Sequence, residues 1–293
     1  MIARTDRLPR WLTLAPALVM FGGLTVFPLV ELVELSLNDV TYRNGVAEWR
    51  WTGLAHYADA LQDGLFRAGI GNTLIFAVAA VSMQMVLGFG LALLTSRVVR
   101  GQGLYRSVFI LPILVPAIVI GAMWKLMLNG DFGIVNQLTD LLGIAPRDWL
   151  GEKSTALLSV IVVDIWHWTP FCFLLLLAGL ESMPRDVFEA AQIDGARWWS
   201  ELRHVTLPLM APMIAVTLLF RLILAFKVFD EVFLLTSGGP GTSTEVVSLT
   251  IFRRFFNEGR TGHGAALSII TMLAIVVLVL AAASRVMRRG RPA

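Results

Sequence analysis

Residues 184–208 read PRDVFEAAQIDGARWWSELRHVTLP, a polar, helix-forming stretch that lies between two strongly apolar segments. Pro184 suits the start of a helix, because its missing N–H would have no partner there in any case. Asp186 and Glu189 place carboxylates near the positive end of the helix dipole. Gly195 is then expected to end or bend the helix. This pattern indicates a segment that contacts something outside the membrane.

The same stretch combines small residues with acids. Ala190, Ala191 and Gly195 would let another surface approach the backbone closely, while Glu189 and Asp194 offer charge-assisted hydrogen bonds beside this bare patch. A second helical piece is expected after the glycine, with an apolar stripe and a proline that marks where the next apolar segment begins. Its residues are Trp198, Trp199, Leu202, Val205 and Pro208.

The composition as a whole indicates a membrane protein. Of the 293 residues, 56% are hydrophobic and 15% are charged, whereas charged residues make up about a quarter of an average soluble domain. The net charge of +3 comes mostly from arginines at segment ends, which suits anionic lipid headgroups and requires no nucleic acid. The single cysteine, Cys172, excludes an internal disulfide and is expected to be an inert core residue.

Six apolar segments are each about the twenty residues needed to cross ~30 Å of hydrocarbon. The first is predicted to be an uncleaved spanning helix, because its apolar stretch is long for a signal peptide and no cleavage site precedes Glu31. An all-α membrane protein with six transmembrane helices is therefore predicted. The expected parts are an amino-terminal region with the first helix (1–36), a polar outer loop (37–70) with a short helix from His56 to Phe66, a transmembrane core (71–285) containing a polar loop (181–208), and a basic tail (286–293). The core helices are expected at about 72–94, 108–128, 156–180, 209–235 and 265–283.

The distribution of arginine and lysine predicts the orientation. With the termini inside, thirteen basic residues lie on short inner segments and eight lie on longer outer ones, and the remaining three fall within membrane segments. The inner set is Arg4, Arg7, Arg10, Arg97, Arg100, Arg106, Arg185, Arg197, Arg203, Arg285, Arg288, Arg289 and Arg291. Because cytoplasmic loops carry the excess of positive charge, both termini and residues 184–208 are expected in the cytoplasm.

At Glu189-Ala190-Ala191, followed by Asp194-Gly195 and then Leu207-Pro208, the sequence resembles the EAA loop of permease subunits of bacterial ABC importers. In that family the loop is a short cytoplasmic helix pair that docks into a cleft of the ATPase subunit and carries its movement to the pore. The resemblance implies a type I ABC importer transmembrane domain and assigns ATPase coupling to one set of residues. These are Glu189, Ala190, Ala191, Asp194, Gly195, Leu207 and Pro208.

Other stretches extend the resemblance over most of the chain. Residues 52–57 are similar to a GL-x-N/H-Y stretch of sugar permeases. Two outer loops resemble those of the first permease subunit of maltose-type carbohydrate importers. One loop contains residues 130–136 and Trp149-Leu150, and the other contains residues 236–244 with a Gly-Gly-Pro turn. The match is to the shorter, six-helix members of that group.

The resemblance also implies a function and a set of partners. It implies a multi-pass subunit of the bacterial cytoplasmic (inner) membrane that imports a carbohydrate, polyol or glycerol derivative by alternating access. The implied partners are a second homologous permease, two ATP-binding cassette ATPases, a periplasmic or extracellular solute-binding protein and membrane lipid. No cofactor and no catalysis are expected of this chain, because residues 151–155 lack the spacing of a phosphate loop; ATP and Mg²⁺ belong to the partner ATPase.

Several ionisable or aromatic residues fall inside the apolar segments. A charge at the centre of a membrane helix costs about 2.5–3.5 kcal/mol on insertion scales, so Arg221 is expected to face protein or water. Lys227 precedes Asp230 and Glu231 by three and four residues, a spacing that would let one helical face neutralise itself. Structural pairing and lining of a solute pathway are both open for these charges.

Another helical face is expected to combine an aromatic ring with hydrogen-bonding groups, as sugar sites do: Asp164, His167 and Trp168. Packing of the ring between helices is the alternative. No metal site is expected, since the four histidines are scattered in the sequence and His167 with Asp164 would need further ligands. A rival hypothesis is a proton-coupled secondary transporter with Asp164, Asp230 and Glu231 as the relay.

Overall fold

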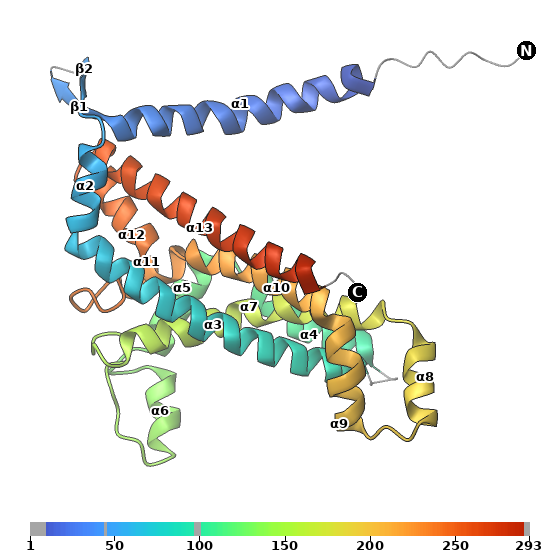
Figure 1. The fold of residues 1–293 in the computed structure, drawn as a ribbon. Helices are drawn as coiled ribbons and strands as arrows, with labels where there is room; N and C mark the ends of the chain where they lie inside the picture. The colour runs from blue at the N-terminus through green and yellow to red at the C-terminus, as the bar shows by residue number, and fades with distance from the viewer. Residues whose placement is uncertain (1–9, 44–45, 97–100, 290–293) are drawn as a thin grey trace, which may run out of the picture. The chain divides into compact units, whose positions relative to one another are not determined.

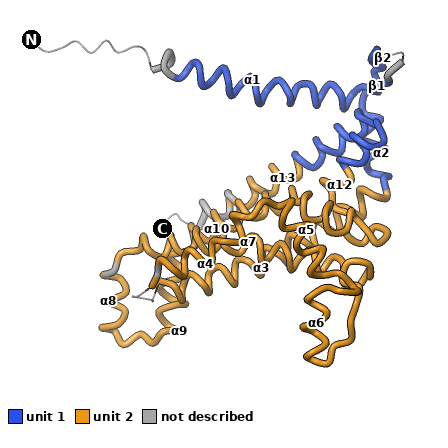
Figure 2. The backbone as a smooth tube through the Cα atoms, turned by 180° about the vertical axis from the view of Figure 1, so that it is seen from behind, with its two compact units in different colours: residues 1–63, 251–272 blue, residues 64–250, 273–293 orange. Residues whose placement is uncertain are grey.

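The computed structural model describes residues 10–43, 46–96 and 101–289. Helices dominate the described chain, which divides into two compact units (Figures 1 and 2). The first unit comprises residues 1–63 and 251–272, and the second comprises residues 64–250 and 273–293. Five of the predicted inner arginines lie outside the described residues: Arg4, Arg7, Arg97, Arg100 and Arg291.

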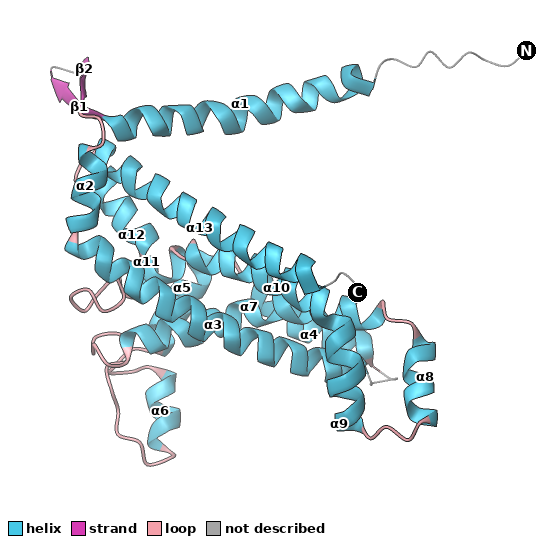
Figure 3. Cartoon of the chain, in the orientation of Figure 1, coloured by secondary structure: helices cyan, strands magenta, loops and turns pink. Residues whose placement is uncertain are grey.

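The first unit begins with a spanning helix and continues into a small fold that the sequence did not predict in full. Its elements are α1 (Arg10–Leu37), β1 (Asn38–Arg43), β2 (Val46–Trp51), α2 (Ala55–Gln62), the last residues of α12 (Val247–Phe252), the π-helix η2 (Arg253–Asn257) and the start of α13 (Thr261–Arg289). The strands pair antiparallel, with Asn38 opposite Trp51 and Arg43 opposite Val46 (Figure 3). A two-stranded hairpin thus stands where a loop was expected, and α2 ends at Gln62 instead of Phe66.

The second unit contains the helices that form the membrane core. Its elements are α3 (Gly64–Ser96), α4 (Gln102–Leu114), α5 (Ala117–Met127), α6 (Ile134–Asp140), α7 (Ala156–Glu181), α8 (Arg185–Ile193), α9 (Trp198–Glu201), the π-helix η1 (Leu202–Thr206), α10 (Leu207–Phe226), α11 (Asp230–Leu235), the start of α12 and the rest of α13. Because α3 starts at Gly64, it extends well before the predicted residue 72. Helix α13 likewise extends past the predicted residue 283.

Among the described residues, five helices are long and apolar enough to cross a membrane, or six if the bent pair α4–α5 is one span. This agrees with the six predicted crossings. The expected straight helix 108–128 is wrong, however, because α4 and α5 meet at 91°. Pro116 has no N–H to continue the helix and disfavours the helical conformation for Val115, which is extended at φ −81° and ψ 127°.

The predicted helix 209–235 is also two helices. Helix α10 ends at Phe226, and α11 starts at Asp230 after a break in which Phe229 has φ −140° and ψ −58°. Asp230 and Glu231 then occupy the first turn of α11, where a carboxylate faces the positive end of the helix dipole. The helical spacing on which the predicted pairing of Lys227 depended is therefore absent.

The core of the second unit lies where α3, α7 and α10 pack together. Phe173, Leu176 and Met210 are almost fully buried there, and the ring of Phe109 meets that of Phe173 edge-on at a centroid distance of 5.5 Å. Cys172 belongs to the same cluster and is buried, as its sequence context predicted.

Candidate functional site

The segment predicted to couple to an ATPase forms a helix that ends in a tight glycine turn. Helix α8 runs from Arg185 to Ile193. The N–H of Ala196 donates to the carbonyl of Ala191 at 2.9 Å, and the N–H of Gly195 donates to that of Gln192 at 3.0 Å. This pair of hydrogen bonds is a Schellman motif, which places a left-handed residue directly after the C-cap, here Asp194. Gly195 supplies it with φ +75°.

The second helical piece is continuous with the membrane. Helix α9, the π turn η1 and α10 form one helix from Trp198 to Phe226, 29 residues long. Helix α10 begins at Leu207, next to Pro208, as predicted, yet no break separates it from the polar segment. Helix α9 is therefore part of the same continuous helix as the spanning segment α10.

The outer face of this segment is exposed and partly apolar. Glu189, Ala190 and Asp194 are exposed, and Ala191 is half-buried. Ile193 is 86% exposed and Trp199 62%. Large apolar side chains left exposed among charged residues mark an interaction surface. We call residues 185–206 the docking segment; α8 and α9 lie at one end of α3 and α7, and α6 lies towards the other (Figure 1).

A cavity of about 430 Å³ separates part of the docking segment from the helix ends behind it. Its lining comes from α3, α7, α8, α9 and η1 and from the loop after α7: Leu93, Ser96, Leu180, Met183, Phe188, Gln192, Glu201 and Thr206. The cavity therefore lies between the docking segment and the ends of α3 and α7.

A buried polar cluster joins three helices in the membrane core. Arg221 of α10 is 1% exposed; its Nη2 donates to Oδ2 of Asp164 on α7, and its Nε donates to Oε1 of Gln84 on α3 at 2.7 Å. Gln84 in turn donates to Oδ2 of Asp164 at 2.8 Å. The guanidinium also lies 4.9 Å from the centre of the Trp168 ring. Sequence reasoning selected the two charges but missed Gln84, because an uncharged amide carries no signal of its partners.

A second buried pair lies beside the first. Nδ1 of His167 is 3.0 Å from Oε1 of Glu231, and both side chains are almost fully buried. Lys227 and Asp230 are exposed, so the predicted self-neutralising face is wrong: Glu231 contacts His167 from α7 instead. Of the residues selected for a solute pathway, five come together and two stay apart.

Sequence reasoning also missed a pocket at the end of the second unit where α6 lies. The pocket has a volume of about 500 Å³ and is lined by the end of α5, the loops on either side of α6 and the Gly-Gly-Pro turn. Lys125, Asp131 and Asp148 give it polar walls. The sequence had drawn attention to residues 130–136, Trp149-Leu150 and the Gly-Gly-Pro turn, but it did not indicate that they share one pocket with Lys125 and Asp148.

The expectation that all the histidines are scattered is wrong for two of them. His56 and His263 lie close together in the first unit, with Asp59 beside them. The fold achieves this by bringing α2 against the first turn of α13, a contact that sequence spacing could not indicate.

The spanning helices and the exposed docking segment are those of a multi-pass membrane protein with an exposed interaction surface. The family described as "Binding-protein-dependent transport system inner membrane component" matches residues 84–290, and the chain belongs to this family. It is accordingly a multi-pass protein of the inner membrane and the transport subunit of an ABC importer, in which the ATPase is a separate subunit.

Individual relatives match over nearly the whole chain. The trehalose/maltose transport system permease protein MalF of Thermococcus litoralis is 36% identical, over 91% of this chain and 89% of its own length. The sulfoquinovosyl glycerol transport system permease protein SmoG of Agrobacterium fabrum is 31% identical, over 97% and 91%. The fold is shared with a bacterial ABC transporter that imports the acidic polysaccharide alginate, at a TM-score of 0.84, 24% identity and 96% coverage of both chains.

Proposed function

We propose that this permease subunit imports a carbohydrate or a related polyol or glycerol derivative by alternating access, driven by ATP hydrolysis in partner ATPases that grip the docking segment. Family membership removes the rival proton-coupled secondary transporter. The observation that carries the coupling role is the exposed, partly apolar docking segment, which continues without a break into α10.

Coupling requires a path from the docking segment to the membrane core. The path begins at α9 and runs along α10 to Arg221, which is hydrogen-bonded to α3 and α7. A movement of α9 would therefore act on α10, α3 and α7 together. For transport, this movement must switch the core between two discrete arrangements whose balance ATP shifts.

The proposed assembly contains a second homologous permease, two ATPases that use ATP and Mg²⁺, and an outer solute-binding protein. The description of the family as binding-protein-dependent supports the last of these. The proposed orientation has both termini and the docking segment in the cytoplasm, as the distribution of arginine and lysine favours. The pocket of about 500 Å³ then opens on the outer side, where delivered solute would arrive.

A carbohydrate-type solute has two kinds of support. Two relatives are named as permeases for trehalose and maltose and for a glycoside of glycerol. In the membrane core, the half-buried Trp168 ring lies beside the polar groups of Arg221 and His167. An aromatic face covers the apolar C–H surface of a sugar while neighbouring polar groups take its hydroxyls.

The energy source gives the direct test. Cells that express the whole transporter are supplied with radiolabelled candidate sugars, and uptake is measured after ATP depletion or after an uncoupler that leaves ATP intact. The proposal predicts that ATP depletion abolishes uptake and that the uncoupler leaves it unchanged. Uptake that follows the proton gradient and ignores ATP would refute it.

A further inference from the structure

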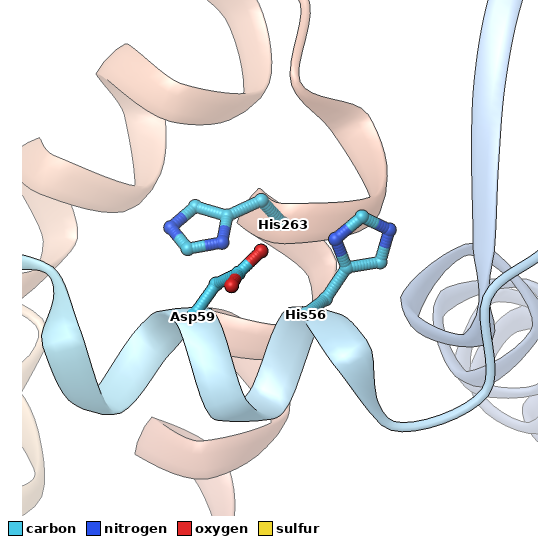
Figure 4. A group of neighbouring side chains, drawn as sticks. All are labelled: His56, Asp59 and His263. Carbon is cyan, nitrogen blue, oxygen red and sulfur yellow. The ribbon is translucent and has the colours of Figure 1, made fainter.

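Three side chains of the first unit converge on one point. None of them belongs to the docking segment, the buried polar cluster or the polar pocket described above. His56 and Asp59 lie one turn apart on α2, and His263 lies in the first turn of α13. One candidate ligand atom from each lies within 4.8 Å of the other two. The two rings and the carboxylate point toward one another in Figure 4.

The hydrogen bonds of the two rings determine which nitrogens remain open. Nε2 of His56 donates to the carbonyl of Asn38 at 3.2 Å, and Nε2 of His263 donates to Oδ2 of Asp63 at 3.1 Å. With the proton on Nε2, each Nδ1 presents a lone pair. Both Nδ1 atoms are buried and have no hydrogen-bond partner among the described residues. Leaving a buried polar atom unsatisfied is destabilising, and here two such atoms lie next to a carboxylate.

We propose that His56 Nδ1, His263 Nδ1 and the Asp59 carboxylate bind a divalent transition-metal ion of the zinc class. Two imidazoles and one carboxylate suit Zn²⁺ and its neighbours in the first transition row, whereas Ca²⁺ and Mg²⁺ prefer sites built of oxygen alone. Ligands held at about 2.0–2.2 Å from one zinc ion lie roughly 3–4 Å apart. The three candidate atoms lie within 4.8 Å of one another, so on binding the side chains would have to rotate to bring them closer.

The surroundings match those of metal-binding histidines. Such histidines donate their second ring N–H to a backbone carbonyl or a carboxylate, which fixes the tautomer and the ring orientation. Asn38 and Asp63 play these two roles. Asp63 is itself held by Arg254, whose Nε and Nη2 donate to its two oxygens at 2.9 and 3.0 Å.

The backbone also prepares the site. A Cβ atom on Gly262 would lie 2.3 Å from the carbonyl oxygen of Asn38 and 2.6 Å from Nε2 of His56. Glycine is therefore required for the ring of His56 to pack against the first turn of α13. The ion would join the segment after the first span to the start of the last span, and so stabilise the first unit.

A metal-free arrangement accounts for the geometry less well. If Nδ1 of either ring carried the proton and donated to Asp59, the lone pair of Nε2 would face an acceptor, the Asn38 carbonyl or the Asp63 carboxylate. Two acceptors in contact repel each other. Protonation of both nitrogens of His263 would add a charge to an almost fully buried ring.

The test uses the purified full-length chain in detergent, stripped of metal and titrated with Zn²⁺ and, separately, with Co²⁺. We expect one ion per chain, a visible Co²⁺ absorption typical of a low-symmetry nitrogen and oxygen site, and a rise in the thermal unfolding temperature with Zn²⁺. Asp59→Asn, His56→Ala and His263→Ala should each weaken binding at least about tenfold, since even outer partners of metal ligands contribute 10–100-fold.

Matched variants separate a built site from adventitious binding. His204→Ala removes an exposed histidine of the docking segment and should leave Zn²⁺ affinity unchanged. Asp59 is exposed, so Asp59→Asn should fold even if His263→Ala does not. Wild-type protein that binds Zn²⁺ no more tightly than Asp59→Asn, or that shows no Zn²⁺-dependent rise in unfolding temperature, would overturn the proposal. Neither readout depends on transport.

Discussion

Arg221 is a cation buried in the middle of a spanning helix, and its stability there depends on its partners. Asp164 neutralises its charge, Gln84 accepts a hydrogen bond from its Nε, and Trp168 covers its face. Removing one member of a buried ion pair leaves an uncompensated charge, whereas removing both charges together is often nearly neutral. The cluster therefore holds α3, α7 and α10 together.

Arg221→Met is expected to destabilise the purified chain by about 3–5 kcal/mol, because the Asp164 carboxyl would stay buried without its cationic partner. Adding Asp164→Asn should restore most of that loss, since the amide still has Gln84 as a hydrogen-bond partner. Thermal unfolding in detergent measures both effects. A double variant as unstable as Arg221→Met alone would contradict the role of charge pairing.

Gly195 offers a test of coupling at a single residue. Valine at φ +75° is strongly disfavoured, and a strain of about 1–2 kcal/mol would shift the balance between two arrangements of the docking segment roughly tenfold. We expect Gly195→Val to reduce uptake to that degree or more without loss of membrane insertion, as measured by solute uptake and by immunoblots of membranes.

Gly143 provides the matched control for that variant. It also has φ +75°, and no atom lies within 4 Å of its Cβ position, as at Gly195. Gly143→Val thus imposes the same backbone strain at the other end of the second unit and should import normally. Equal solute uptake by Gly195→Val and Gly143→Val would show that Gly195 has no specific role in coupling.

At the scale of the element, α8 and α9 present apolar side chains that no described part of the second unit covers. Ile193 is 86% exposed, and burying such a side chain against a partner is worth about 1.5–3 kcal/mol. Ile193→Ser should therefore weaken binding of the ATPases about tenfold or more, measured by their copurification with the permease across a salt and detergent series.

Leu142, 77% exposed on the loop after α6, is the control for Ile193. Leu142→Ser replaces an exposed apolar side chain by a hydroxyl, as Ile193→Ser does, but outside the docking segment. The Leu142→Ser permease should therefore copurify with the ATPases as the wild type does. Ile193→Ser that copurifies with them as well as wild type does would show that another surface makes the contact.

The elements also show where sequence reasoning succeeds and where it ends. Long apolar runs predict spanning helices well, because crossing the bilayer imposes one length and one composition. The bend at Pro116 could have been predicted, since the residue before a proline is restricted. The break before Asp230 could not, because no proline or glycine marks it and the pairing of Glu231 with His167 depends on packing.

For the whole molecule, the sequence predicted the number of crossings and the family but not the contacts across the fold. The paired strands 38–43 and 46–51 were missed, although Val40, Thr41 and Tyr42 favour a strand. Gln84, the polar pocket and the His56–His263 contact each join residues that are far apart in the chain. Such contacts leave no periodic pattern, so only the fold discloses them.

The central claim is that the docking segment faces the cytoplasm, where ATPases reach it. The native Cys172 is buried, so a single exposed cysteine at Gln192→Cys is reported cleanly by a membrane-impermeant maleimide. We expect labelling of Gln192→Cys in inside-out vesicles and none in intact right-side-out membranes, with the opposite result for Asp140→Cys on α6. Labelling of Gln192→Cys from outside would refute the cytoplasmic position of the docking segment, because no ATPase could then bind it.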